Sequence, residues 1–265
     1  MRAQFEWGAR TYVMGILNLT PDSFSGDGVQ DDPAAALQQA LRMEADGADI
    51  IDIGGMSTRP QHQPVPVEEE MRRVMAVLPE VVARLRIPVS IDTFTYEVAV
   101  AAIEAGAAAI NDIWGLQREP RLAELAAGSG ATLFLMHNQD GTTYDDLLAD
   151  IAVSLARGVA VAEAAGVPRD RLVIDPGIGF GKTADQNLEV LSRLSELRSL
   201  GLSILLGTSR KSTIGQVLGT DVSERLEGTA ATVALGIAAG ADMVRVHDVL
   251  QMTRVARMSD AVVRR

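Results

Sequence analysis

The sequence has 265 residues, 47% hydrophobic and 22% charged, enough apolar material for one large barrel or two smaller domains. The formal net charge of -11 argues against a nucleic-acid partner, because binding a phosphate backbone needs clustered Lys and Arg. The absence of cysteine excludes disulfides, thiolate nucleophiles and cysteine-bound metals, and it suits a cytoplasmic protein.

Membrane insertion is not expected. The first residues lack the apolar core of a signal peptide. The longest uncharged stretch, residues 228–241, is too short to span a bilayer and is interpreted as a buried helix. We therefore expect a small-molecule partner.

Eight short apolar runs, each followed by a helical pattern, divide the chain at roughly one per 33 residues, which is typical of a (β/α)8 barrel. No stretch resembles a linker, so we predict a single-domain (β/α)8 TIM barrel over residues 1–265. Apolar residues at three- and four-residue spacing predict helices such as 33–45, 67–85 and 147–165. The strands are predicted near residues 12–17, 49–53, 89–91, 109–111, 132–136, 172–174, 203–206 and 243–246.

An open, doubly wound sheet is the alternative, since it also alternates strands and helices. Nearly every predicted strand ends in a polar residue, however. In an open sheet only the strands beside the crevice need such ends, whereas in a barrel all eight converge on one mouth. The barrel is therefore favoured. The polar ends are Asn18, Asp52, Asp92, Asn111, His137, Asp175, Thr208 with Lys211, and Arg245 with His247.

Residues 172–183 form the most informative segment. An apolar strand runs into Asp175 and then into a glycine-rich turn whose backbone can approach a ligand closely. Neither the P-loop nor the dinucleotide spacing of glycines fits. A plain Asp-Pro turn after a core strand is the alternative for this segment taken alone.

Sorted by charge, the predicted mouth has two halves. Acceptors and amides from Asp52, Asp92, Asn111 and Asp175 suit a ligand rich in N–H donors, such as a fused amino-pyrimidinone ring. Lys211, Arg245 and His247 follow the seventh and eighth strands, where such barrels often hold phosphate, and a helix opening near Ser212 adds backbone N–H groups. The sequence therefore predicts a heterocycle beside an anion.

Some of these residues also have ordinary explanations. Asp92 can cap the next helix, and His137 can be a satisfied core histidine. Ser209 has no evident base beside it, so nucleophilic catalysis is not expected. No histidine cluster offers a zinc site, whereas Asn18 is a hard oxygen ligand suited to magnesium together with substrate phosphate. The terminal residues Arg264 and Arg265 are assigned to the solvated surface.

The motifs taken together resemble dihydropteroate synthases over nearly the whole chain. The resemblance implies condensation of 7,8-dihydropterin-6-ylmethyl diphosphate with 4-aminobenzoate, giving 7,8-dihydropteroate and diphosphate for folate synthesis. It rests on residues 15–25 (GILNLTPDSFS), 52–60 (DIGGMSTRP), 90–93 (SIDT), 110–112 (IND), 175–183 (DPGIGFGKT), 207–212 (GTSRKS) and 245–248 (RVHD).

The resemblance also implies roles for residues. Asp92, Asn111, Asp175 and Lys211 would hold the pterin above Met136. Thr58, Arg59, Arg245 and His247 would bind the diphosphate, with Asn18 contacting Mg²⁺. Phe180, Ser212 and the loops of Phe24 and Pro60 would enclose the 4-aminobenzoate, where sulfonamides bind in this family. Asp92, Lys211, Arg245 and His247 would be the catalytic set.

The chain departs from the family pattern at a few places. They lie at Met56, Gln61, Trp114 to Leu116 and Asn138. In the first loop, residues 25–28, the acidic residue of the family pattern is displaced by one position, which leaves open whether Asp22 or Asp27 assists when the loop closes over the site. None of these departures removes an implied ligand.

Two other functions stay open at this stage. One is a pterin-binding methyltransferase that uses methyltetrahydrofolate and a corrinoid protein; the other is a silent paralogue without catalysis. The first has no use for Arg59, Lys211, Arg245 and His247, and intact Asn18 and Asp92 argue against the second. A homodimer is usual for the family, and the predicted exposed helix 248–265 is the expected place for its interface.

Overall fold

The computed structural model describes residues 5–20, 32–56 and 65–264. Within these ranges eight parallel strands form one closed barrel in chain order, and β8 pairs with β1 to close it. The (β/α)8 barrel prediction is confirmed, and the open sheet is wrong. The strands are β1 (Tyr12–Asn18), β2 (Ile50–Gly54), β3 (Val89–Asp92), β4 (Ala109–Asp112), β5 (Thr132–Met136), β6 (Leu172–Asp175), β7 (Ser203–Leu206) and β8 (Met243–Val246).

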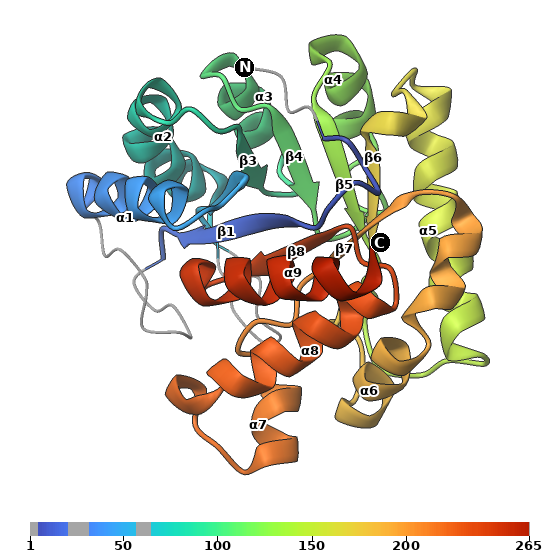
Figure 1. Cartoon of the computed structure of the whole chain (residues 1–265). Helices are drawn as coiled ribbons and strands as arrows, with labels where there is room; N and C mark the ends of the chain where they lie inside the picture. The colour runs from blue at the N-terminus through green and yellow to red at the C-terminus, as the bar shows by residue number, and fades with distance from the viewer. Residues whose placement is uncertain (1–4, 21–31, 57–64, 265) are drawn as a thin grey trace.

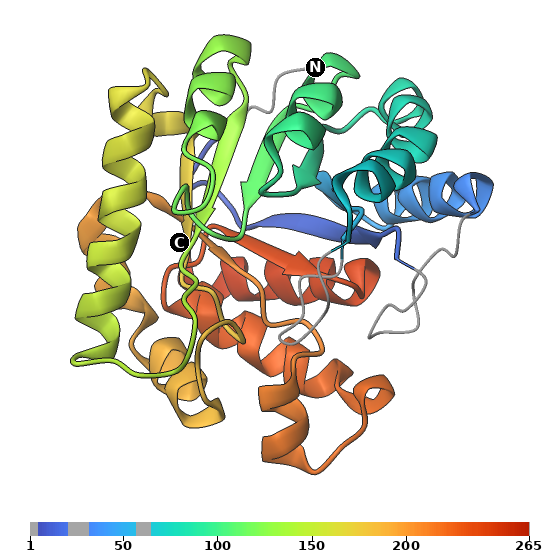
Figure 2. The same cartoon turned by 180° about the vertical axis from the view of Figure 1, so that it is seen from behind.

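Helices surround the barrel on its outside, as the two opposite views show (Figures 1 and 2). The predicted helices at 33–45, 67–85 and 147–165 are confirmed, with ends shifted by at most one residue. The helices are α1 (Pro33–Ala45), α2 (Val67–Arg84), α3 (Tyr96–Glu104), α4 (Arg121–Ser129), α5 (Leu147–Ala164), α6 (Ala184–Ser192), α7 (Ser212–Leu218), α8 (Leu226–Ala238) and α9 (Val249–Val263).

The strands are apolar along nearly their whole length because both of their faces are covered. One set of side chains fills the barrel interior, including Met14, Phe134 and Met243, and the aromatic rings of Phe5 and Trp7 pack against this set. The larger core lies between the strands and the surrounding helices. Apolar side chains thus cover both faces of the barrel sheet, so the polar groups lie where the strands end.

Three helix ends follow the glycine pattern expected from the sequence. Gly47, Gly106 and Gly240 have φ values of 103°, 104° and 101°, in the left-handed region that only glycine adopts readily. Each glycine reverses the chain immediately before β2, β4 or β8. This repeated turn brings each strand into the sheet at the same end of the barrel.

The helix over residues 228–241 differs from the prediction of a buried helix. It forms α8, whose inner side packs so closely that a Cβ on Gly236 would lie 2.1 Å from Leu206 Cδ2. Its outer side carries Leu235, which is 68% exposed. An uncharged sequence does not distinguish a buried helix from one with an exposed apolar side, which explains the error. No helix in the described ranges has the length and apolar character needed to cross a membrane.

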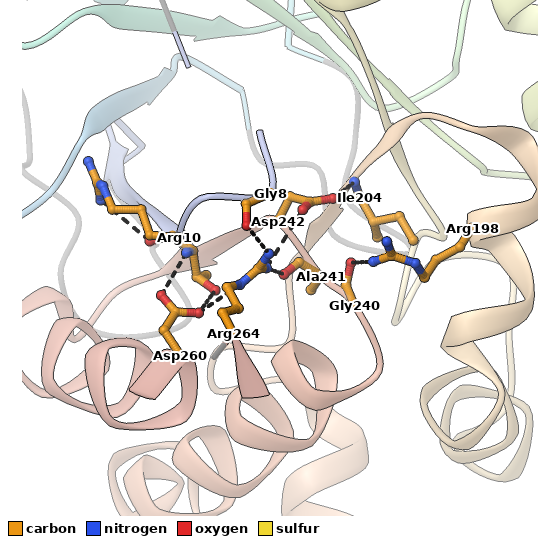
Figure 3. A network of polar contacts seen from close by, with 10 residues as sticks. Gly8, Arg10, Arg198, Ile204, Gly240, Ala241, Asp242, Asp260 and Arg264 are labelled. Atoms are coloured by element: carbon orange, nitrogen blue, oxygen red, sulfur yellow. Dashed lines mark hydrogen bonds and ion pairs between the residues drawn. The ribbon is translucent and has the colours of Figure 1, made fainter. Parts of the chain in front are cut away.

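A polar network joins the end of the C-terminal helix to the segments that precede β1 and β8, at the N-terminal ends of these strands (Figure 3). Arg264 donates to the carbonyl oxygens of Gly8 (3.1 Å) and Ala241 (2.8 Å) and forms ion pairs with Asp260 and Asp242. Asp260 in turn accepts from the backbone N–H and the hydroxyl of Thr11, both at 2.7 Å. The Arg264 side chain is only 15% exposed, so its assignment to the solvated surface is wrong.

Replacing Arg264 by alanine should lower the free energy of unfolding by about 2 kcal/mol, because two carbonyls and two carboxylates lose a charged donor. Urea unfolding measures this change. Arg254→Ala is the matched control, since Arg254 is an exposed arginine of the same helix. Equal losses in the two variants would show that the network contributes nothing beyond charge.

Candidate active site

The polar strand ends meet at the mouth formed by the C-terminal ends of the strands. Asn18, Asp92, Asp175 and Met136 are the last residues of β1, β3, β6 and β5. Ser212 is the first residue of α7 and is exposed. Several expected positions lie outside the described residues, namely Thr58, Arg59, Phe24, Pro60, Gln61, Asp22 and Asp27.

Arg245 links the two predicted halves of the mouth. Its Nε donates to Asp52 Oδ2 at 2.7 Å, and its Nη2 donates to Asp92 Oδ2 at 2.8 Å. The amide of Asn111 donates to the same Asp52 oxygen at 2.9 Å. The acidic and basic groups therefore form one connected cluster instead of two separate halves.

The second oxygens of two of these carboxylates have no partner. Asp52 Oδ1 and Asp92 Oδ1 are buried and accept no hydrogen bond from the described part of the chain. Buried acceptors are nearly always satisfied in native proteins, by protein, water or ligand. Together they mark a place where a ligand with N–H donors would bind.

Burial changes the acid-base properties of this cluster. It raises the pKa of Asp92 to about 7, against the opposing charge of Arg245, and it also raises the pKa of Asp175. Burial alone would lower the pKa of Arg245, but Asp52 and Asp92 raise it. The guanidinium thus stays charged, while Asp92 titrates near neutral pH.

Lys211 stands beside Asp175 on the other side of the mouth. Its Nζ donates to the carbonyl of Ile178 and lies 4.6 Å from the centre of the Phe180 ring. A Cβ at Gly207 would lie 3.9 Å from both Asp175 Oδ2 and Lys211 Nζ, so these groups face the same small space. Burial lowers the pKa of Lys211 to about 8, and Asp175 opposes this change.

Ser209 and His247 form a pair that the sequence did not predict. Ser209 Oγ lies 2.9 Å from His247 Nδ1, so the expectation that Ser209 has no adjacent base is wrong in geometry. Burial and the charge of Arg245 lower the pKa of His247 to about 3. A ring this weakly basic does not activate a hydroxyl at neutral pH. For the same reason His247 contributes a hydrogen-bonding group to the mouth and no positive charge.

Asp52 is the site residue that sequence reasoning undervalued. It was predicted among the acceptors at the mouth but was not among the residues to which the resemblance gave a role, although it is fully buried and holds both Arg245 and Asn111. A carboxylate within the apolar run of β2 was the available signal. Asp92, by contrast, makes its side-chain contact to Arg245, which favours a site role over helix capping.

The surroundings of Asn18 fit a magnesium ion held mainly by substrate. A Cβ at Gly54 would lie 3.9 Å from Asn18 Oδ1 and 3.6 Å from Asp92 Oδ2, so both oxygens face one space. The described residues contain no group of three or more His, Asp or Glu able to hold a metal. One hard protein oxygen, completed by phosphate oxygens and water, is a usual arrangement for Mg²⁺.

The fold and the site define a (β/α)8 barrel whose mouth holds buried carboxylates bound to a guanidinium. Residues 14–247 match the family model described as "Pterin binding enzyme". The chain belongs to this pterin-binding enzyme family.

Within this family, the chain is similar to dihydropteroate synthases. It is 50% identical to the dihydropteroate synthase of Clostridium beijerinckii, over 99% of this chain and 98% of that one. It is 49% identical to the Bacillus subtilis dihydropteroate synthase, over 96% and 89% of the two chains. A crystal structure of the Clostridium difficile enzyme, solved in the presence of pteroic acid, superposes with a TM-score of 0.94 at 49% identity, over 99% and 100% of the chains.

Proposed function

We propose that this chain is a dihydropteroate synthase, which condenses 7,8-dihydropterin-6-ylmethyl diphosphate with 4-aminobenzoate to give 7,8-dihydropteroate and diphosphate. Identity of 50% over nearly the whole length of a dihydropteroate synthase supports this function. The geometric observation that carries it is Arg245, a charged group bound to two buried carboxylates that each keep one free oxygen.

The reaction is a substitution at the methylene carbon of the pterin. The bond from this carbon to the diphosphate oxygen breaks with its electron pair, and the amine nitrogen of 4-aminobenzoate forms the new bond and loses one proton. The pterin ring delocalises the cation that develops at the carbon. An ionised Asp92, held beside the ring in a buried site, stabilises that cation electrostatically.

We assign the pterin to the acidic side of the mouth. Its N–H groups would meet the free oxygen of Asp92 and the second oxygen of Asp175, and Asn111 and Lys211 would bind its remaining polar edge. Met136 is 4% exposed at the end of β5 and would lie beneath the ring. These roles remain proposals, supported by the positions of the residues.

We assign the diphosphate to Arg245, with His247 as a neutral hydrogen-bonding partner. Binding it adds negative charge next to Asp52 and Asp92, so a permanently charged guanidinium is required there. The contributions of Thr58 and Arg59 stay predictions. Mg²⁺ would be held at Asn18 and would neutralise charge on the leaving diphosphate. Phe180 and Ser212 would enclose the 4-aminobenzoate, Phe180 through its ring beside Lys211.

We also propose that the chain forms a homodimer through α8 and α9. These helices pack against each other along their length (Figure 1). Their outer sides expose Leu235 (68%), Met258 (66%) and Val262 (55%). Exposed apolar side chains of this size on two helices that pack together favour a protein interface. Sedimentation of the wild-type chain beside a Leu235→Glu variant tests the dimer, and a cytoplasmic location stays a prediction.

Diphosphate release by the purified chain tests the function. Release should require the pterin diphosphate, 4-aminobenzoate and Mg²⁺ together, with dihydropteroate as the product, and EDTA should abolish it. Pterin binding without release would contradict the synthase function and favour a silent paralogue. Methyl transfer to a corrinoid protein would identify the methyltransferase instead.

A further inference from the structure

The segment after β6 contains a second half-buried amine, that of Lys182, which the proposed reaction does not use. Only two of the 24 Lys and Arg residues of the chain are lysines, Lys182 and Lys211, and both lie at the mouth of the barrel. Arginine provides nearly all positive charge elsewhere in the sequence. A lysine at these positions therefore points to a requirement for a compact ammonium group.

Lys182 Nζ is surrounded by three acceptors. It lies 2.9 Å from His137 Nδ1 and donates to the carbonyl oxygens of Gly177 and Phe180, both at 3.0 Å. Burial and the charge of Lys182 lower the pKa of His137 to about 3, so the ring is neutral and its Nδ1 accepts. Three acceptors around one nitrogen match the three N–H donors of an ammonium group.

One of these contacts joins two loops of the mouth. His137 follows β5, whereas Lys182, Gly177 and Phe180 all lie in the loop between β6 and α6, so the other two contacts fold that loop onto itself. The loops lie so close that a Cβ on Gly177 would come within 1.9 Å of the His137 carbonyl oxygen. A second bond of the same kind runs from the Tyr144 hydroxyl to the Gly181 carbonyl at 2.7 Å. The loop after β6 is therefore fixed to the loop after β5.

The opposite side of the same loop is fixed to α7. Asn187 is buried, and its Oδ1 accepts from the Gly179 backbone at 2.7 Å while its amide donates to Thr213 at 3.1 Å. Phe180 lies between these two attachments and contacts Lys211 through its ring. The backbone that carries the Phe180 ring is thus held on both sides.

We propose that Lys182 is a positioning residue for the second substrate, which holds Phe180 in place as a wall of the 4-aminobenzoate site. This inference rests on the proposed function. Asn111, which is assigned to the pterin, lies in β4 and bonds to Asp52. Asp175, the other residue assigned to the pterin, ends β6 and accepts from the backbone N–H of Gly177, whose carbonyl accepts from Lys182, so the loss of Lys182 can affect it only through this one residue and through charge. Loss of Lys182 should therefore affect the second substrate much more than the first.

Lys182→Met removes the donors and keeps most of the side-chain volume. The KM for 4-aminobenzoate should rise about 10- to 100-fold, since small misplacements of positioning groups have effects of this size. The Kd of the pterin diphosphate should change by less than about threefold. Lys182→Gln, which keeps two N–H donors, should give a smaller rise and serves as a second variant if Lys182→Met folds poorly. Asp185→Asn, an exposed change in the same segment, should leave both constants unchanged.

Nuclear magnetic resonance of the wild-type chain carrying ¹⁵N-labelled lysine tests the attachment without any reaction. Burial lowers the pKa of Lys182 to about 7 and that of Lys211 to about 8, so spectra recorded below pH 7 should contain two side-chain ammonium signals, and Lys182→Met identifies one of them. That signal should show protons protected from exchange and a coupling to the His137 ring. Rapid exchange, or equal effects of Lys182→Met on both substrates, would overturn the proposal. A wild-type chain that makes no dihydropteroate would refute the function alone, because the ammonium signal would still report the attachment.

Discussion

Arg245→Ala should lower kcat/KM for dihydropteroate formation by at least about 10³-fold, or roughly 4 kcal/mol of transition-state stabilisation. The guanidinium is assigned to the leaving diphosphate, and it also holds Asp52 and Asp92. Removing it leaves two buried carboxylates without a counterion, which should reduce the free energy of unfolding by about 3–5 kcal/mol. Steady-state kinetics and urea unfolding measure the two effects separately.

From the roles implied by the sequence alone, Arg245→Ala would cripple diphosphate use and leave pterin recognition partly intact, and Asp175→Ala would do the reverse. The hydrogen bond from Arg245 to Asp92 changes the expectation for Arg245→Ala. Asp92 is assigned to the pterin and loses its charged partner in this variant, so pterin binding should weaken as well. Asp175→Ala should still weaken pterin binding more than diphosphate use. Arg245→Lys is the matched control, since an ammonium group keeps the positive charge but cannot donate to both carboxylates with the geometry of the planar guanidinium. Wild-type turnover in Arg245→Ala would refute the site assignment.

Asp92→Asn should lower kcat/KM by about 10²- to 10³-fold, because an amide of the same shape cannot stabilise a developing cation. In the wild-type chain, kcat/KM should rise with pH through the pKa of Asp92, about 7 in the free enzyme. The variant should lose this rise. Asp112→Asn is the control: the pKa of Asp112 is also raised by burial, to about 6, but its carboxylate accepts from the backbone of Trp114 and Leu116.

The same pKa has the opposite effect on stability. The ordinary pKa of Asp92 is 3.8 and the folded chain raises it to about 7, so between these values the folded state binds the proton more tightly than the unfolded state. The contribution of Asp92 to stability is therefore greatest at low pH and falls as pH rises toward 7. Asp92→Asn should flatten this part of the stability profile. An unchanged profile would show that Asp92 is already ionised at the lower end of the range.

The strands could be predicted closely because each is a short apolar run stopped by a polar residue. Both faces of every barrel strand are buried, so the run itself defines the strand, as in residues 132–136, which form β5 without any shift. The polar residue that stops the run then marks the mouth. This is why Asp92, Asn111 and Asp175 could be named from sequence.

The pairing of these residues could not be predicted. Arg245 and Asp52 are 193 positions apart, and nothing local indicates which carboxylate a distant arginine will meet once the barrel closes. The Ser209–His247 contact and the burial of Arg264 depend on closure in the same way. Sequence patterns describe single elements, whereas these contacts are properties of the closed ring.

Closure also has a consequence for how the chain is made. The ring is completed where β8 meets β1, so the first strand to be synthesised pairs with the last, and Asp260 and Arg264 bind the Gly8 to Thr11 segment later still. While β8 remains in the ribosomal exit tunnel, one edge of β1 has unpaired backbone N–H and C=O groups. Such an edge can pair with other chains and cause aggregation. A ribosome that stalls within α9 therefore still holds β8 in its tunnel and presents an open sheet that can bind other chains.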